Sequence, residues 1–335
     1  MRIHNFNTKE KVLIIAEVGN NHEGDYKLAE KLIVLAAESG ANAVKFQTII
    51  PEKLVSIKQT ERINQLKSFQ FSYEQFNSLA DFAKKEGIIF LSTPFDIESA
   101  IFLDSIVPAF KIASGDNNFF PLIESISKTG KPIIMSTGLM NIEEIKNSVN
   151  FIKKIWDNNN IIQKVALLHC VSLYPTKPEF ANLLGIKAIE PIADIVGYSD
   201  HTLGIDAAVL SVALGARIIE KHFTIDNNYS NFRDHKLSAD PANFKMMVNK
   251  IRIAEKMLGD GEKIICEDEI NIKNDLRRSI VARYDLEKGH KIKYADLNWV
   301  RPYKGFSPGE ESNIIGRTTN TKIYVGSRIT EDYLI

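Results

Sequence analysis

Hydrophobic residues along the chain gather in eight short runs, and each run ends in polar or small residues. The runs are continuously apolar rather than alternating, which is typical of parallel strands that are buried on both faces. The pattern therefore predicts eight buried strands, at residues 12–19, 43–48, 88–95, 109–115, 132–138, 165–170, 195–200 and 217–224.

The segments between these runs carry apolar residues at helical spacing. Residues 26–40 and 76–87 each stop at a glycine, and residues 141–155 place acids early and lysines late, as a helix dipole favours. Residues 121–130 and 205–216 are also predicted to be helical. Eight strand–helix units with right-handed crossovers favour a (β/α)8 TIM barrel, an α/β fold. A doubly wound open sheet is the alternative, but no GxGxxG follows the first strand.

The pattern changes towards the C-terminus. We expect the barrel domain to occupy residues 1–260 and a charged, irregular linker to occupy residues 261–277. Short strand-like pieces separated by glycine and proline then predict a small, mainly β domain at residues 278–335.

Composition narrows the classes of partner. The chain has 42 Lys+Arg and 42 Asp+Glu, so charge gives no argument for a nucleic acid or an anionic membrane as partner. No apolar stretch approaches the roughly 20 residues that cross a bilayer, and the polar start MRIHNFNTKEK lacks the apolar core of a secretory signal. Only two cysteines occur, Cys170 and Cys266, and their flanks differ. A cytoplasmic location is the simplest expectation.

Two histidines end consecutive predicted strands, and in such a barrel active sites lie at the carboxyl ends of the strands. Parallel neighbours lie about 4.8 Å apart, so His201 and His222 could reach one Mn²⁺, Mg²⁺ or Zn²⁺ acting as a Lewis acid. Alternatively, the imidazoles close the barrel through hydrogen bonds alone.

Two lysines also stand at strand ends, Lys45 and Lys111, with several hydroxyl groups on neighbouring strands. Such a ring of cations and hydroxyls is typical of a phosphate or carboxylate site. The hydroxyls belong to Thr93, Ser114, Ser136 and Ser199. Lys45 has two other interpretations, a Schiff-base amine or a salt bridge to Glu17 or Glu220.

Three carboxylates are candidates for proton transfer, namely Glu17, Asp116 and Asp234. Each could instead be a structural partner of a nearby cation or loop.

The ordered motifs IIAEVGNNHEGD, VKFQT, STPFD, KIASGD, MSTG, LLHCVSLYPT, GYSDHT and IEKHFT resemble the sialic acid synthase family, the bacterial nonulosonic acid synthases. The tail, with RRSIVAR, NWVRP and IIGR, is similar to the family's antifreeze-like (SAF) domain. The resemblance runs from Val12 to the C-terminus.

The resemblance implies an enzyme, a transferase that condenses phosphoenolpyruvate with the open-chain aldehyde of an N-acylated hexosamine. The products are a nine-carbon 2-keto acid and phosphate. It also implies a divalent cation, commonly Mn²⁺ with Mg²⁺ or Co²⁺ as the other options. Members form domain-swapped homodimers in which the small domain of one chain covers the barrel of the other. N-acetylmannosamine, which gives N-acetylneuraminate, is the expected acceptor, and diacetamido-trideoxy precursors of legionaminic or pseudaminic acid are the alternatives.

Carried over residue by residue, the resemblance assigns roles to thirteen positions. Its metal ligands are His201 and His222, and its phosphoenolpyruvate site is Lys45, Thr93, Ser114, Ser136 and Ser199. Its catalytic carboxylates are Glu17 and Asp116, and its sugar-site positions are Gln47, Tyr174, Asp234 and the partner-delivered Arg301. Asp116 stands where the family has glutamate and Ser172 where it has asparagine, and both departures bear on which sugar is used.

Two rival functions remain open from the sequence. An aldolase would form a Schiff base at Lys45 and work without a divalent cation. A non-catalytic sugar-binding protein would bind the sugar without releasing phosphate.

Overall fold

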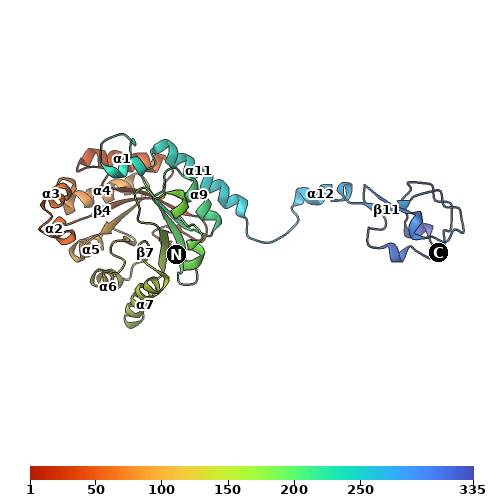
Figure 1. Ribbon diagram of the computed structural model, residues 1–335, viewed down its shortest axis with the longest axis horizontal. Helices are drawn as coiled ribbons and strands as arrows, with labels where there is room; N and C mark the ends of the chain where they lie inside the picture. Colours follow the sequence, from red (N-terminus) through yellow and green to blue (C-terminus); the bar gives the residue numbers. More distant parts are fainter. The chain divides into compact units, whose positions relative to one another are not determined.

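The computed structural model describes residues 1–335, which divide into two compact units, Met1–Gly259 and Asp260–Ile335 (Figure 1). Each unit has its own hydrophobic core. None of the helices is both long and apolar enough to span a membrane.

The first unit is a barrel of eight parallel strands. Their order in the sheet is β5-β4-β3-β10-β9-β8-β7-β6, and β5 packs against β6, so the sheet is nearly closed. This arrangement confirms the (β/α)8 prediction over the open sheet. The strands are β3 (Leu13–Gly19), β4 (Ala43–Thr48), β5 (Ile89–Pro94), β6 (Phe110–Ile112), β7 (Ile133–Ser136), β8 (Val165–Cys170), β9 (Ile195–Asp200) and β10 (Ile218–His222).

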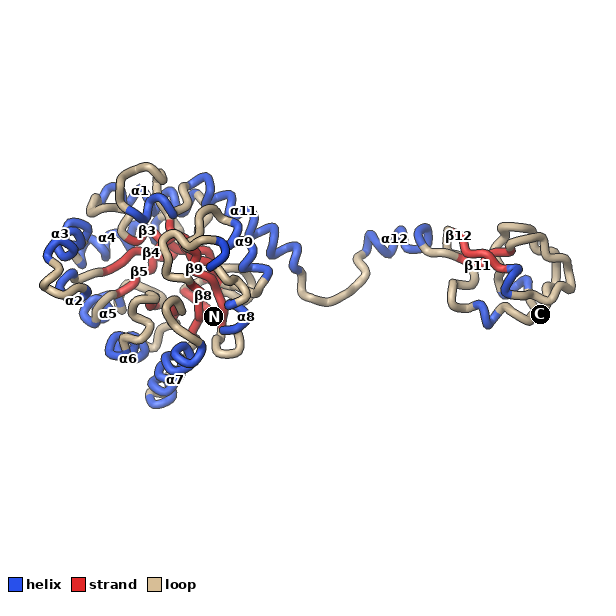
Figure 2. The backbone as a smooth tube through the Cα atoms, viewed as in Figure 1, coloured by secondary structure: helices blue, strands red, loops and turns tan.

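Helices surround this sheet on its outer face (Figure 2). Side-chain caps fix where several of them begin: Asp25 accepts backbone N–H groups at the start of α1, and Ser72 and Gln75 form a capping box on α4. The helices of this unit are α1 (Tyr26–Glu38), α2 (Pro51–Leu54), α3 (Thr60–Phe69), α4 (Tyr73–Lys85), α5 (Ile97–Leu103), α6 (Phe120–Lys128), α7 (Ile142–Asn158), α8 (Gly185–Ile189), α9 (Asp206–Ala213), α10 (Arg233–Leu237) and α11 (Pro241–Leu258).

The barrel interior changes from apolar to polar along each strand. Near the amino-terminal ends, inward side chains such as Leu13, Ile15 and Ile218 form one cluster with Met1 and Ile3. The latter two belong to the terminal segment that carries the small hairpin β1 (Arg2–Ile3) and β2 (Phe6–Asn7), which closes this end.

Successive inward positions on a strand are two residues apart. The next inward residues are therefore polar: Glu17 follows Ile15, Lys45 follows Ala43, Thr93 follows Leu91, Lys111 follows Ala109, Ser136 follows Ile134 and Glu220 follows Ile218. This step places one polar layer at the carboxyl ends of the strands, above a filled apolar core.

The second unit contains one α-helix, α12 (Glu267–Leu276), three short 3-10 helices, and the antiparallel pair β11 (Ser279–Ala282) and β12 (Leu297–Val300). Isolated bridges and short turns complete it around a small core that includes Ile280 and Leu297. The stretch expected to be an irregular linker thus contains a helix. Its first turn holds Glu267, Asp268 and Glu269, and these acidic side chains stabilise the positive, amino-terminal end of the helix dipole. None of the residues of α12 is buried.

Candidate active site

A polar cavity of about 60 Å³ opens among the carboxyl ends of the barrel strands. A larger hollow of about 590 Å³ lies elsewhere on the unit, but its titratable residues His4, Asp81 and Lys84 are all exposed. Only the smaller cavity collects buried charged groups. It is lined by Glu17, Lys45, Gln47, Thr93, Phe95, Lys111, Ala113, Ser114, Ser136, Cys170, Tyr174, Ser199, His201, Glu220 and His222.

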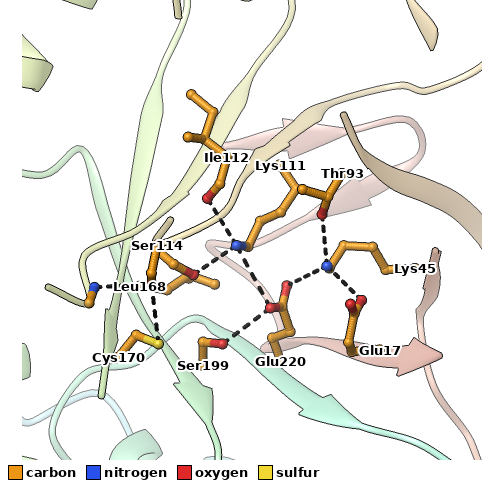
Figure 3. Close-up of polar contacts among 12 residues, drawn as sticks. Glu17, Lys45, Thr93, Lys111, Ile112, Ser114, Leu168, Cys170, Ser199 and Glu220 are labelled. Atoms are coloured by element: carbon orange, nitrogen blue, oxygen red, sulfur yellow. Dashed lines mark hydrogen bonds and ion pairs between the residues drawn. The ribbon is translucent and has the colours of Figure 1, made fainter. Parts of the chain in front are cut away.

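Lys45 lies between two carboxylates (Figure 3). Its Nζ is 2.5 Å from Glu17 Oε2, 3.7 Å from Glu220 Oε2, and donates to Thr93 Oγ1 at 3.0 Å. Burial opposes its charge, but the two carboxylates outweigh burial and raise the pKa of Lys45 above its ordinary value. An amine held protonated is no nucleophile, which weighs against the Schiff-base interpretation.

Lys111 approaches the same carboxylate from the opposite side of the barrel. Its Nζ donates to Ser136 Oγ at 2.7 Å and to Ile112 O at 3.0 Å, and lies 3.8 Å from Glu220 Oε1. Burial lowers the pKa of Lys111, and Glu220 opposes that effect. The site thus has two buried ammonium groups within reach of one anion.

Glu220 is the centre of this network. It accepts a hydrogen bond from Ser199 Oγ at 3.1 Å, while its Oε2 is buried without a hydrogen-bond partner. Burial favours its neutral form, but Lys111 and Lys45 together hold the pKa of Glu220 well below its usual range. From the sequence, Glu220 was predicted only as a possible salt-bridge partner of Lys45. Its inward position beside His222 on one strand was the signal that it belongs to the site.

Lys221 points the other way, as strand alternation predicts. Its Nζ is 2.8 Å from Asp200 Oδ2 and donates to Thr202 O at 2.5 Å, outside the cavity lining. The run Glu220-Lys221-His222 therefore divides between two faces of β10.

The two histidines converge, with ring centroids 5.5 Å apart. His201 Nδ1 donates to Val171 O at 2.9 Å, so its Nε2 is available as a ligand atom. Burial lowers the pKa of His222 to about 3, which keeps the ring neutral, and its buried Nδ1 has no partner. No group of three or more His, Cys, Asp or Glu residues forms a complete ligand set. Two imidazoles alone would leave most coordination positions of a divalent cation to water and substrate.

Two of the sugar-site positions from the sequence, Gln47 and Tyr174, line the same cavity. Gln47 Nε2 donates to Glu17 Oε1 at 3.0 Å, and the Tyr174 ring centroid is 4.2 Å from that of His201. Asp234 is buried on α10, where its Oδ1 accepts from Arg233 Nε at 3.0 Å.

Three expected residues are not among those that line the cavity, namely Asp116, Asp234 and Arg301. Asp116 lies in the loop after β6; burial raises its pKa to about 6 against the opposing effect of Lys111, and its Oδ2 is buried without a partner. Arg301 follows β12 in the second unit, where it lines a separate hollow of about 480 Å³.

Gly138, which follows β7, packs closely against two serine side chains, Ser114 and Ser172. A Cβ built on Gly138 would lie 2.4 Å from Ser172 Oγ and 2.7 Å from Ser114 Oγ, so only glycine fits there. Gly138 N donates to Ser114 Oγ at 3.2 Å, which turns this hydroxyl towards the cavity it lines.

Comparisons with known proteins agree with this geometry. An uncharacterized protein of Methanocaldococcus jannaschii is 47% identical over 92% of this chain and 90% of its own. The N,N'-diacetyllegionaminic acid synthase of Legionella pneumophila is 39% identical over 96% of this chain and 94% of its own. The solved N-acetylneuraminic acid (sialic acid) synthetase of Leptospira borgpetersenii, in complex with citrate, is 35% identical, with a TM-score of 0.76 over 82% of this chain and 96% of that one.

Two family models also match the chain, in the two units that the structure separates. The model of the NeuB family matches residues 32–263, and the model of the SAF domain matches residues 277–334. The chain therefore belongs to the NeuB family, the sialic acid synthase family, and carries its SAF domain.

Proposed function

We propose that this protein condenses phosphoenolpyruvate with an N-acylated hexosamine, giving a nonulosonic acid and inorganic phosphate. The family is one of synthases, and the chain is an enzyme of this transferase type. The observation that carries the proposal is the pair of buried lysines, Lys45 and Lys111, that share the polar layer of the barrel with a set of hydroxyls.

Phosphoenolpyruvate carries a carboxylate and a phosphate, and the cavity offers matching donors. Lys45 and Thr93 lie together on one side, and Lys111 and Ser136 on the other. Burial raises the pKa of Glu17, and the charge of the neighbouring Lys45 opposes that effect. Buried, pre-oriented cations of this kind stabilise charge that shifts during a reaction.

The proposed chemistry forms one C–C bond and one C–O bond, and breaks the C–O bond to phosphate. C3 of phosphoenolpyruvate attacks the aldehyde carbon of the open-chain sugar, and the aldehyde oxygen takes up a proton. Water adds at C2 and loses a proton, for which Glu17 and Asp116 are the candidate bases. The new C2 hydroxyl then gives its proton to the departing phosphate as the bond from C2 to the bridging oxygen breaks, which releases phosphate and leaves the 2-keto acid.

We assign the divalent cation, Mn²⁺ in the first instance, to His201 and His222. The neutral state of His222 and the tautomer of His201 support this assignment. When bound there, such an ion polarises the acceptor's aldehyde as a Lewis acid. Tyr174, packed against His201, restricts how the sugar approaches the two imidazoles.

For the acceptor we propose a diacetamido-trideoxyhexose, as in the precursor of legionaminic acid. The legionaminic acid synthase is 39% identical over 96% of this chain, against 35% over 82% for the sialic acid synthetase. N-acetylmannosamine, which the sequence analysis favoured, and the pseudaminic acid precursor are the alternatives. We also propose a cytoplasmic, domain-swapped homodimer in which the partner's copy of Arg301 reaches the N-acyl group.

The test is phosphate release from phosphoenolpyruvate with Mn²⁺ and each of the three sugars in turn. We expect release only when phosphoenolpyruvate and a sugar are both present, with the diacetamido precursor of legionaminic acid used best. A reaction without the sugar serves as the control for simple hydrolysis. A protein that binds sugar but releases no phosphate from any of the three would overturn the proposal in favour of a non-catalytic role.

A further inference from the structure

We infer that Arg233 belongs to the acceptor site and donates hydrogen bonds to the carbonyl oxygen of a second acylamino group on the sugar. This inference rests on the proposed function and deepens it, since it names the feature of the substrate that a particular side chain reads. It comes from the contacts of Arg233 with the cavity wall.

Arg233 is the first residue of α10, and its guanidinium stacks over Tyr174. Its Cζ lies 4.9 Å from the centroid of that ring. Tyr174 lines the cavity and packs against His201, one of the two proposed metal ligands. The guanidinium therefore lies at the edge of the site and contacts Tyr174 and Asp234, two of the positions expected to bind the sugar.

Most of the donors of Arg233 remain unused within the protein. Its one hydrogen bond runs from Nε to Asp234 Oδ1 at 3.0 Å, which leaves both terminal amino groups free. The side chain is 66% exposed, so these groups are accessible to a ligand. Asp234 neutralises the guanidinium, and this pairing matches a neutral carbonyl better than a phosphate on the sugar.

The short helix that carries Arg233 is held in place by contacts of its neighbour His235 with Glu23 and Thr224. We call these three residues the latch. His235 is fully buried; its Nε2 lies 2.9 Å from Glu23 Oε1 and its Nδ1 2.6 Å from Thr224 Oγ1. Glu23 has a φ of 47°, in the left-handed region that non-glycine residues rarely occupy. The latch joins the loop after β3 to α10, so Arg233 starts from a pre-organised backbone.

The two candidate classes of acceptor sugar differ in how many acylamino groups they carry. N-acetylmannosamine has one acylamino group, which the proposed function assigns to Arg301 of the partner chain. A diacetamido-trideoxyhexose has a second one, which needs its own donor because a buried carbonyl without a partner weakens binding. Arg233 supplies that donor, so it contributes to discrimination between the two classes of sugar.

The test compares Arg233→Ala, Arg233→Lys and the unchanged enzyme by kcat/KM with each sugar. We expect Arg233→Ala to lower kcat/KM for the diacetamido sugar about tenfold and to leave values for N-acetylmannosamine and the KM for phosphoenolpyruvate within about twofold. Arg233→Lys keeps the charge but loses the planar fork, so it should not restore activity. The matched control is Lys236→Ala, an exposed cation on the same helix.

The outcomes separate this inference from the function on which it rests. Equal losses with both sugars, no loss with either, or full rescue by Arg233→Lys would overturn the role of Arg233 while leaving the synthase activity intact. An unchanged enzyme that turns over none of the sugars would overturn both.

Discussion

Lys45 and Glu17 form a buried ion pair in the polar layer of the barrel, with Nζ 2.5 Å from Oε2 and both side chains at most 4% exposed. We predict that Lys45→Met lowers the rate of phosphate release by at least about 100-fold. The change removes a cation from the proposed phosphoenolpyruvate site and leaves Glu17 and Glu220 without this partner.

Lys53→Met is the matched control, because Lys53 also pairs with a glutamate, Glu98, but on the exposed surface. It should retain the wild-type rate. Thermal melts of both variants separate loss of chemistry from loss of fold, and a Lys45→Met enzyme that is folded and fully active would remove the proposed anion site.

Asp116 gives a prediction about pH and stability. Burial raises its pKa from 3.8 to about 6 in the folded protein, so the folded state holds this proton more tightly than the unfolded chain. Its contribution to stability is complete below pH 3.8 and is lost as pH rises through about 6. Asp116→Asn cannot ionise, so its melting temperature relative to wild type should be higher at pH 7.5 than at pH 4.5.

The exposed Asp157→Asn provides the comparison for this measurement. The melting temperature of Asp157→Asn relative to wild type should be nearly the same at both pH values. If the melting temperature of Asp116→Asn relative to wild type does not change with pH, or falls as pH rises, then burial does not raise the pKa of Asp116.

The two converging imidazoles predict dependence on a divalent cation. Treatment with a chelator should abolish phosphate release, and Mn²⁺ should restore it. His222→Ala should bind less Mn²⁺ in calorimetry and lose turnover, because it removes one of the two proposed protein ligands. His4→Gln, at an exposed position, should behave as wild type. Full activity of the chelated enzyme would leave the histidines with a hydrogen-bonding role alone.

The strand pattern could be predicted because each strand is buried on both faces and so appears as an uninterrupted apolar run. Helix α3 could not, since only Ile63 and Leu66 of its ten residues are buried and its apolar periodicity is weak. Helix α12 was missed for the same reason, as it buries no residue at all.

The composition of the polar layer could also be predicted, because the ends of parallel strands meet at one end of a barrel. The central place of Glu220 could not. It pairs with Lys111 from β6, which lies across the barrel from β10 in the strand order, and sequence gives no register between opposite strands. The contact of His235 with Glu23 joins residues far apart in sequence, so it could not be predicted either.

The outward-facing ion pair of Lys221 and Asp200 predicts an effect on stability. Both side chains are at most 1% exposed and their charged atoms are 2.8 Å apart. Removing one partner leaves the other charge buried and unpaired, so Lys221→Ala should lower the free energy of unfolding by about 3–5 kcal/mol. In a denaturant melt, Lys146→Ala, which breaks the exposed pair with Glu143, should change it by at most about 1 kcal/mol. Equal effects would show that burial of the first pair carries no penalty.

The proposed domain swap predicts that two defective chains restore one working site. In a dimer of Lys45→Met with Arg301→Ala, one barrel keeps Lys45 and receives the intact Arg301 of the other chain. Co-expression with two different tags, followed by purification through both, yields only mixed dimers. Phosphate release at low acceptor concentration should reach about half of the wild-type value, well above either variant alone.

The pairing of Lys45→Met with His222→Ala is the control, because both changes lie in the barrel and every site in that mixed dimer is defective. It should show no recovery. If each chain instead used its own Arg301, the first pairing would also fail to recover, since no barrel would combine an intact Lys45 with an intact arginine. Recovery confined to the first pairing is therefore the result that only a lid exchanged between chains produces.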